Sequence, residues 1–386
     1  MSQLLESRWS ETKEALLEGL QGHKRTVMAT TLENTRKYLS ESATAGATSA
    51  GNVATLNRVI LPVIRRVMPT VIANELVGVQ PMTGPVGQIH TLRVRYSDAS
   101  EFAAGTEALS PFQIAQGYSA NSSSATARAA STAALEGVAG NKLSIQILKQ
   151  TVEAKTRKLS ARWTFEAAQD AQAQQGIDIE AEIMAALAQE ITAEIDQEVI
   201  GSLNSLAGTV LTYDQNTVSG TATFVGDEHA ALAVQINRAA NLIAQRTRRG
   251  AGNYAVLSPT TLTILQSATT SAFARTTEGT FEAPTNTKFV GTLNGAMKVY
   301  VNSYASSDDV LIGYKGASES DAPAFYCPYI PLMSSGVVLD PSTFEPVVSF
   351  MTRYGYVELT NTASSLGNAA DYLAKVAVTT ANLKFA

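Results

Sequence analysis

The sequence predicts a mixed α/β (α+β) protein, and three patterns in its 386 residues support that class. Apolar residues recur at helical spacing from Asp178 to Leu206, which predicts one long amphipathic helix. Apolar and polar residues alternate at 88–96 and again at 143–163, which predicts two long strands. After Thr209, helical and strand-like patterns take turns, which is typical of a mixed sheet covered by helices.

Composition narrows the classes of function. The 29 basic and 34 acidic residues give a net charge of -5, which argues against a protein that grips nucleic acid through a strongly positive face. The length exceeds the roughly 100 to 200 residues of one domain, so we expect two packed subdomains. The longest apolar region, Val59 to Val79, contains Arg65, Arg66 and two prolines and could not cross a bilayer. We therefore expect no membrane partner.

Residues that commonly form disulfides, metal sites or nucleophilic triads are scarce. The single cysteine, Cys327, excludes an intramolecular disulfide and is expected to be a small buried hydrophobe. The three histidines lie at no ligand spacing, so we expect neither a zinc site nor another cofactor. Because the chain has no G-x-S-x-G sequence, a hydrolase that uses unpaired carboxylates is the one enzyme alternative.

The first 41 residues predict one or two amphipathic helices, because apolar residues recur at helical spacing between charged ones. Residues 42–52 are small, polar and glycine-containing, which predicts a linker. The apolar segment 53–79 is interrupted by Pro62 and Pro69, each of which ends or kinks a helix.

The stretch between the two predicted strands, residues 97–142, is rich in small residues and lacks a clear period. Loops longer than about 15 residues are usually functional or disordered. Two interpretations therefore stay open, the tip of an extended loop and a disordered linker.

Three glutamates, Glu190, Glu194 and Glu198, share one face of the predicted long helix, where like charges four residues apart repel. A solvated face is one explanation. A carboxylate metal cage is another, although di-iron bundles need Glu-x-x-His pairs and this helix has no histidine. The third is an ionic contact between subunits, in which the glutamates meet a basic strand of a neighbouring copy. The basic residues of that strand are Lys155, Arg157, Lys158 and Arg162.

The second half of the chain predicts helices at 227–246 and 259–268, the latter with a proline in its first turn. Segment 248–252 has the glycines of a phosphate cradle but lacks the P-loop sequence, so we interpret it as a basic helix C-terminus. Strands are predicted at 254–257, 298–301, 309–313, 324–327 and 344–358.

Six sequence blocks between Ala54 and Gly355 together resemble the major capsid proteins of T-even-like tailed phages. The blocks are Gly78-Val79-Gln80-Pro81-Met82-Thr83-Gly84-Pro85, Arg248-Arg249-Gly250-Ala251-Gly252-Asn253, Gly291-Thr292-Leu293-Asn294-Gly295, Gly313-Tyr314-Lys315-Gly316, Asp321-Ala322 through Pro328-Tyr329, and Thr352-Arg353-Tyr354-Gly355.

That family has the Hong Kong 97-type capsid fold, and the resemblance implies its parts here. The implied parts are an amphipathic leader at 1–41, an N-terminal arm at 42–82, an extended loop with its strand stem at 83–162, a peripheral subdomain with its spine helix at 163–207, an axial subdomain at 208–343, and a return to the peripheral subdomain at 344–386.

The resemblance also implies the function. Copies would assemble into hexamers, with pentamers as a further option, that form an icosahedral head around double-stranded DNA without sequence-specific binding. Expected partners are portal, scaffold, vertex, decoration and maturation-protease proteins. The chain would be made in the host bacterial cytoplasm and reside in the virion, and it would not be an enzyme. The alternative of the same fold is an encapsulin-like nanocompartment.

In the family, the leader contacts the internal scaffold and is often cut after a Leu-X-Glu or Ile-X-Glu triplet. Leu4-Leu5-Glu6, Leu16-Leu17-Glu18 and Leu39-Ser40-Glu41 fit this pattern. Three-residue patterns recur easily by chance, so we expect no cleavage after Glu41. The alternative to a scaffold-facing leader is a helix that lies on its own subunit.

Overall fold

The structure is a computed structural model, and it divides into two compact units, each assembled from segments far apart in the sequence. Unit 1 comprises Met1–Gly87, Val152–Ile200 and Ala324–Val357, and unit 2 comprises Gln88–Thr151, Gly201–Pro323 and Glu358–Ala386. The structure describes residues 9–10, 13–14, 16–17, 20–45, 72–97, 132–136, 142–175, 178–218, 225–247, 249–268, 273–275, 288–319, 321–343, 345–359 and 369–383.

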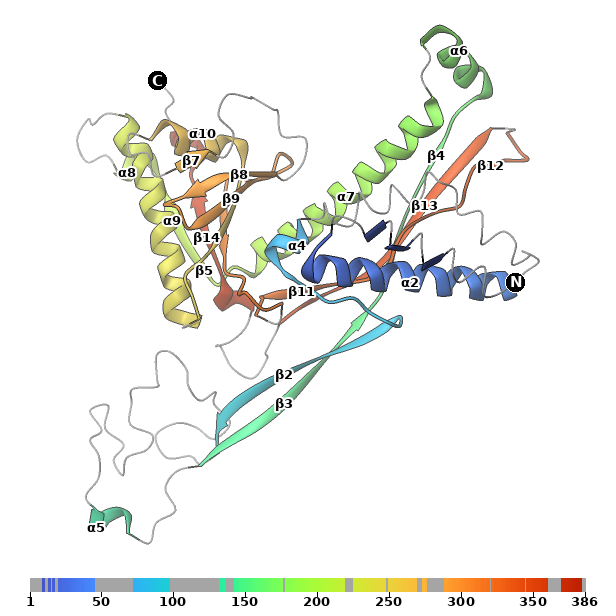
Figure 1. Cartoon of the computed structure of the whole chain (residues 1–386). Coiled ribbons are helices and arrows are strands. Elements are labelled where there is room, and N and C mark those ends of the chain that lie inside the picture. Colours follow the sequence, from blue (N-terminus) through green and yellow to red (C-terminus); the bar gives the residue numbers. More distant parts are fainter. Residues whose placement is uncertain are drawn as a thin grey trace. The chain divides into compact units, whose positions relative to one another are not determined.

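Unit 1 is built on a sheet whose long strands are β11, β13 and β4 (Figure 1). The strand order is β1-β11-β13-β12, and β4 also pairs with β13. Helix α7 and strand β13 run slightly beyond the bounds of the unit. The elements are α2 (Gly22–Ala45), α4 (Ala73–Leu76), β1 (Gly78–Val79), β4 (Lys155–Arg162), α6 (Phe165–Gln175), α7 (Ile179–Leu206), β11 (Ala324–Ser334), β12 (Val338–Leu339) and β13 (Pro346–Glu358).

Strands β11, β12 and β13 form one long hairpin. The Ser335 N–H donates to the Ser349 carbonyl at 2.8 Å, and β12 then pairs with the start of β13. Strand β12 therefore lies along the same edge of β13 as β11. Between β11 and β12, Gly336 has a φ of 71°, which glycine adopts at little cost. On its other edge, β13 pairs antiparallel with the whole of β4.

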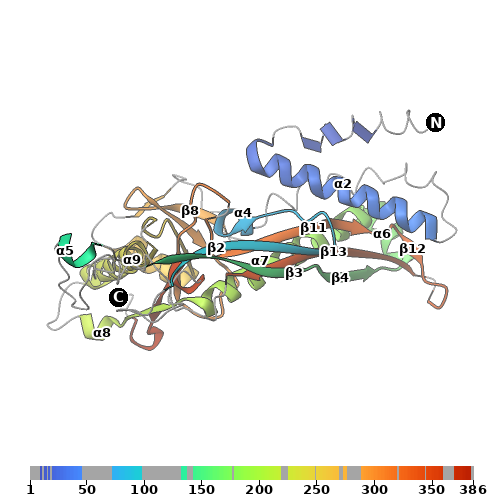
Figure 2. The same cartoon turned by 90° about the horizontal axis from the view of Figure 1, so that it is seen from below.

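Strand β11 is buried on both faces, because Phe325, Tyr326 and Cys327 are all buried although successive side chains point to opposite faces. The burial of Cys327 confirms its prediction. Helix α2 packs along β11, and Figure 2 shows α2 on one side of β11 and β13 and the labelled part of α7 on the other. The predicted apolar stripe of α7, including Ile191 and Ile195, is buried.

The predicted N-terminal helix lies on its own subunit, as α2. It continues to Ala45, so the prediction of a linker at 42–52 is wrong for its first residues. Extending a formed helix adds one hydrogen bond for each residue fixed, which small polar residues at its end do not prevent. The rest of the predicted linker and the arm segment up to Val71 lie outside the described residues.

Strands β2 (Val86–Tyr96) and β3 (Leu143–Glu153) pair as a separate two-stranded ribbon. The prediction of one strand over 143–163 is wrong, because the strand breaks at Ala154, whose N–H donates to the Pro85 carbonyl at 2.9 Å. Its second part is β4, which pairs with β13. Alternation predicts a strand but not its partner. Between β2 and β3 the described residues include α5 (Thr132–Leu135), and most of 97–142 lies outside them.

Unit 2 contains a seven-stranded sheet in the order β5-β14-β10-β6-β9-β8-β7. Pairs β5–β14 and β6–β9 are parallel, and the other described pairs are antiparallel. The elements are β5 (Thr209–Tyr213), α8 (Gln215–Val218), α9 (Val225–Thr247), β6 (Tyr254–Leu257), α10 (Pro259–Ser267), β7 (Phe273–Arg275), β8 (Lys288–Leu293), β9 (Met297–Val301), β10 (Val310–Gly313), η2 (Ala369–Tyr372), β14 (Leu373–Val378) and η3 (Thr380–Asn382).

Helix α9 lies alongside β5 and β14 (Figure 1) and closes the core of unit 2. Its apolar stripe, with Leu232, Ile236 and Ile243, is buried in one cluster with the strand residues. The cap of α10 explains where that helix begins, because the Ser258 hydroxyl oxygen accepts from the Thr261 N–H at 3.2 Å.

The predicted elements of unit 2 are confirmed with small shifts at their ends, and four strands were missed. The helix predicted at 227–246 is α9, and the strand predicted at 254–257 is β6. The missed strands are β5, β7, β8 and β14. Strand β14 begins with the consecutive buried residues Leu373 and Ala374, which hides the alternation of a half-exposed strand. None of the helices in the described ranges combines the length and hydropathy of a membrane span.

We predict that Gly208→Ala destabilises unit 2. The Gly208 N–H donates to the Ala370 carbonyl at 3.2 Å, and a Cβ at Gly208 would lie 2.7 Å from that oxygen. We expect the free energy of unfolding to fall by about 1 to 3 kcal/mol. Gly201→Ala is the control, since a Cβ there meets nothing within 4 Å and should add roughly 0.5 to 1 kcal/mol in a helix. Equal denaturation midpoints for the two variants would contradict the close approach.

Candidate assembly interface

The predicted basic strand and acidic helix meet within one chain, at Arg157. Its Nη1 lies 2.7 Å from Glu194 Oε2, and its Nη2 lies 2.5 Å from Glu198 Oε2. The two glutamates are one turn apart on α7, so a single guanidinium bridges both and offsets their repulsion. We expected this ionic contact between neighbouring copies. The structure instead forms the contact of Arg157 with Glu194 and Glu198 inside the subunit, because β4 pairs with β13 of the same chain.

Tyr354 on β13 completes this bridge. Its hydroxyl donates to Glu198, and Arg157 Nε donates to the Tyr354 oxygen at 2.6 Å. Burial works to raise the pKa of Glu198, but hydrogen bonds from Arg157 and Tyr354 outweigh it and lower that pKa. Burial and the hydrogen bond to Glu198 raise the pKa of Tyr354. At neutral pH the Glu198 carboxylate therefore lies between the Arg157 cation and a neutral Tyr354 phenol.

Two of the predicted contact residues, Lys158 and Arg162, point away from this bridge. They alternate with Arg157 along β4 and are exposed on its other face. Arg162 Nη1 lies 3.7 Å from Glu345 Oε2, a distance at which an exposed pair contributes little. The predicted basic strand thus has two separate charged faces.

The remaining predicted residues flank the bridge. Lys155 acts electrostatically to lower the pKa of Glu198, although less than the hydrogen bonds do. Glu190 is exposed one turn before Glu194. Within the described ranges, no group of three or more His, Cys, Asp or Glu side chains is placed to hold a metal ion. The glutamate face of α7 therefore offers a surface for cationic side chains.

Sequence reasoning missed a buried carboxyl, Asp196, on the inner side of α7. It is 2% exposed, and its Oδ1 accepts from the Ile72 N–H at 2.9 Å. Burial raises the pKa of Asp196 to about 7, although the Ile72 hydrogen bond works to lower it. Its position three residues before the buried Val199, within the apolar stripe, is the sequence signal that could have found it.

In unit 2, three of the sequence blocks that carry the resemblance lie in contact, namely 248–253, 313–316 and the start of 321–329. Arg249 Nη1 lies 2.7 Å from Asp321 Oδ1, and the Tyr372 hydroxyl donates to the same oxygen at 3.3 Å. The Asn253 side chain binds both backbone groups of Lys315, accepting from its N–H at 3.0 Å and donating to its carbonyl at 2.6 Å. These contacts tie the loop after α9 to the loop after β10.

The same loop does not form a phosphate cradle. Helix α9 ends at Thr247, as expected for a helix C-terminus, and the Arg249 guanidinium is paired with Asp321. A Cβ at Gly250 would lie 2.5 Å from the Tyr314 ring, so this glycine serves close packing inside the unit. Arg248 lies outside the described residues.

The β2–β3 ribbon exposes a row of apolar side chains. Leu143, Ile145 and Ile147 alternate along β3 and so share one face, and the two isoleucines are 68% and 66% exposed. A two-stranded ribbon is at best marginally stable alone, and a contiguous apolar surface marks an interaction site. The sequence predicted the strand but not that its apolar face would be exposed in the single chain.

We predict that Arg157→Ala weakens unit 1 modestly. The bridge is partly exposed, so solvent screening limits the loss to about 1 kcal/mol. Lys158→Ala, on the exposed face of β4, is the control and should stay within about 0.5 kcal/mol of the wild type. Denaturation at low and at high salt measures both. If the loss from Arg157→Ala does not shrink in high salt, the bridge is not its cause.

Asp196→Asn should remove a pH dependence of stability. The folded-state pKa of about 7 lies above the unfolded value of ~4, so wild-type stability should fall as pH rises from about 4 to about 7 and stay low above that. The asparagine keeps an acceptor for Ile72 but cannot ionise. Its stability relative to wild type should therefore rise with pH, by up to about 4 kcal/mol. Parallel pH profiles of stability for Asp196→Asn and wild type would refute the assignment.

Comparison with known sequences places the chain in a family. The family model for the major capsid protein Gp23 matches residues 53–137 and 103–378. The major capsid protein of Vibrio phage KVP40 is 30% identical, over 85% of this chain and 82% of that protein. The major capsid protein of Enterobacteria phage T4 is also 30% identical, over 82% of this chain and 78% of that protein.

Solved structures from phages are similar at a greater distance. A chain from the capsid of Myoviridae phage XM1 has a TM-score of 0.46 and 10% identity, with 80% of this chain and 92% of that chain covered. A chain from Mycobacterium phage Bobi has a TM-score of 0.48 and 15% identity, with 88% and 98% covered. The family model and the relatives from phages KVP40 and T4 show that this chain belongs to the Gp23 family of major capsid proteins, which are structural proteins and not enzymes.

Proposed function

We propose that copies of this chain self-assemble into hexamers, and pentamers where the shell curves, that close into the icosahedral head around the double-stranded DNA of a tailed phage. Membership of the Gp23 family supports this function. The observation that carries it in the structure is the apolar row on β3, which a single chain leaves exposed.

The energetic argument concerns Ile145 and Ile147. Fully burying each isoleucine contributes roughly 1.5 to 3 kcal/mol, and every copy in a ring would repeat the contact. Association costs translational and rotational freedom, so a single weak contact would not hold two copies together. Many identical contacts in a closed shell would.

The parts of the Hong Kong 97-type fold then have these places in the chain. The ribbon β2–β3 and the stretch between its strands form the extended loop, and α7 is the spine helix of the peripheral subdomain. The seven-stranded sheet of unit 2 is the axial subdomain. Residues 42–82 form the N-terminal arm, and the chain returns to the peripheral subdomain through β13.

Charged surfaces would set how neighbouring copies align. Lys158, Arg162 and Glu190 are exposed on faces that the intrachain bridge does not use, and they are our proposed contacts between subunits. Repeated exposed ion pairs contribute little affinity but can select partner and register.

The net charge of -5 suits a wall that encloses DNA without sequence-specific binding. The partners are portal, scaffold, vertex or decoration proteins and a maturation protease. The chain is made in the cytoplasm of the host bacterium and functions in the virion. An encapsulin-like compartment is the second candidate, and the phage origin of the KVP40 and T4 relatives favours the head shell over it. The hydrolase alternative has no supporting observation.

We predict that Ile145→Asp with Ile147→Asp leaves the subunit folded but blocks assembly. Both side chains are exposed in the single chain, so the fold loses little, whereas a charge in the covered contact must be desolvated. Gln146→Asp adds a charge to the other face of the same strand and is the control. Circular dichroism measures folding, and electron microscopy with sedimentation measures shells. Normal shells from the double variant would overturn the role of the row, and a wild-type chain that stays a monomer would overturn the proposed function.

A further inference from the structure

A helical strap before α2 folds back on that helix. The strap consists of the described helical residues 9–10, 13–14 and 16–17. Gly22 has a φ of 61°, and the Leu20 N–H donates to the Leu17 carbonyl at 3.2 Å, so the chain reverses just before α2. A Cβ at Gly22 would meet nothing within 4 Å, so the turn needs glycine for its backbone conformation alone.

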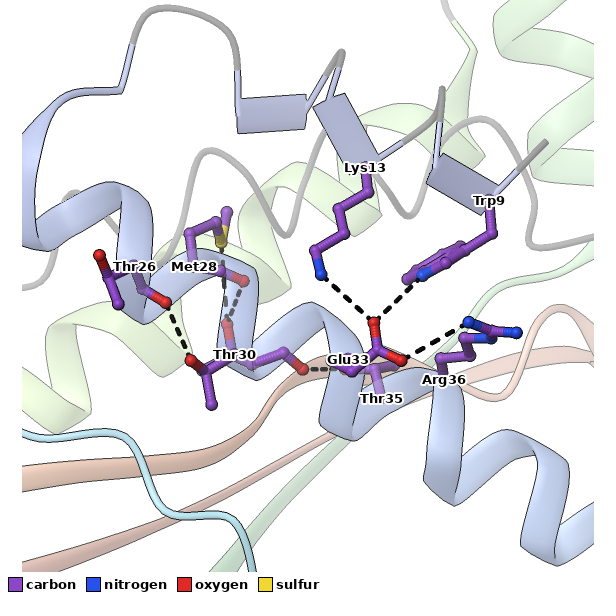
Figure 3. A network of polar contacts seen from close by, with 9 residues as sticks. Trp9, Lys13, Thr26, Met28, Thr30, Glu33, Thr35 and Arg36 are labelled. Carbon is purple, nitrogen blue, oxygen red and sulfur yellow. Dashed lines mark hydrogen bonds and ion pairs between the residues drawn. The ribbon is translucent and has the colours of Figure 1, made fainter. Parts of the chain in front are cut away.

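One carboxylate on α2, that of Glu33, holds the polar side chains of the strap. Its Oε2 accepts from Trp9 Nε1 at 3.4 Å and from Lys13 Nζ at 3.3 Å (Figure 3). On the α2 side, Arg36 Nη1 lies 3.5 Å from its Oε1. Burial works to raise the pKa of Glu33, but Trp9, Lys13 and Arg36 together outweigh it and lower that pKa. Glu33 is therefore ionised at neutral pH, between two cations.

These contacts of the strap are weak ones. The side chains of Lys13 and Glu33 are 29% and 35% exposed, and the distances to Glu33 are long for charge-assisted hydrogen bonds, so solvent screens the pair. The buried apolar side chains on the described part of the strap are Leu16 and Leu17.

Helix α2 is fixed to the sheet of unit 1 by shorter and more deeply buried contacts. Asn34 Nδ2 donates to the carbonyl of Met82 at 2.7 Å and to that of Tyr329 at 2.9 Å. Met28 and Leu32 on the same helix are 2% and 1% exposed. Because a buried carbonyl that loses its partner is costly, α2 should leave the sheet far less often than the strap leaves α2.

We propose that the strap is a hinged lid that leaves α2 as one piece, turning about Gly22, while α2 and the sheet beneath it stay folded. The Glu33 carboxylate is its latch, because one group accepts from both Trp9 and Lys13. Opening uncovers Leu16 and Leu17, two apolar side chains that the closed chain hides. The lid depends on contacts within unit 1 and not on the proposed assembly.

Hydrogen exchange of the full-length, unassembled chain tests the lid. Amides at 13–14 and 16–17 should exchange at least about 100-fold faster than those at 27–35 of α2. Glu33→Gln keeps an acceptor but loses the charge, so it should speed exchange in the strap a further five-fold or so and leave 27–35 unchanged. Glu14→Gln, exposed on the strap, is the control and should change neither.

Equal exchange in the strap and at 27–35 of the wild type would overturn the proposal, because the two would then open together. A Glu33→Gln variant that exchanges like the wild type would overturn the latch.

Gly22→Ala tests the hinge separately. Alanine adopts a positive φ only at a cost, and the added Cβ meets open space, so the closed turn is strained without a clash. Exchange in the strap should rise by about five-fold or more. Gly336→Ala is the matched control, because its φ of 71° and open surroundings are alike but it lies between β11 and β12. Unchanged exchange in Gly22→Ala, or a rise at 27–35 as large as in the strap, would contradict a hinge at Gly22.

Discussion

The need to cover both faces of long strands governs this structure. In unit 1, helix α2 packs along β11, and the labelled part of α7 lies on the opposite side of β11 and β13 (Figure 2). In the ribbon β2–β3, no described element of the chain covers the row at Leu143, Ile145 and Ile147. The first case gives a stable wall, and the second leaves a surface that another copy must complete.

A few polar side chains decide where the covering helices sit. Asn34 binds two backbone carbonyls of the sheet and fixes α2, while Arg157 and Tyr354 hold the outer face of α7 through Glu198. Asp196 ties the inner face of α7 to the backbone at Ile72. Such contacts add modest net stability, but each fixes one arrangement, because misplacing a buried polar group is costly.

Local patterns were predictable from the sequence, and long-range partners were not. The period of the apolar residues gave α7 within one residue at its start, and the run 254–257 is β6. The same kind of pattern joined 143–163 into one strand, because alternation does not reveal that β3 pairs with β2 and β4 with β13. For the candidate site, the charges of Arg157, Glu194 and Glu198 predicted their attraction, but only the fold places them in one chain. The buried role of Asp196 depended on tertiary contacts in the same way.

Hydrogen exchange of the backbone amides tests most directly whether the two strand pairs differ in what covers them. In the unassembled chain, amides of β11 and β13 should be protected, and those of 143–147 in β3 should exchange fast. In assembled particles, protection at 143–147 should rise by two orders of magnitude or more, roughly the effect of burying a surface worth about 3 kcal/mol, while β11 and β13 change little. Equal protection of 143–147 in the free chain and in the particle would contradict the account.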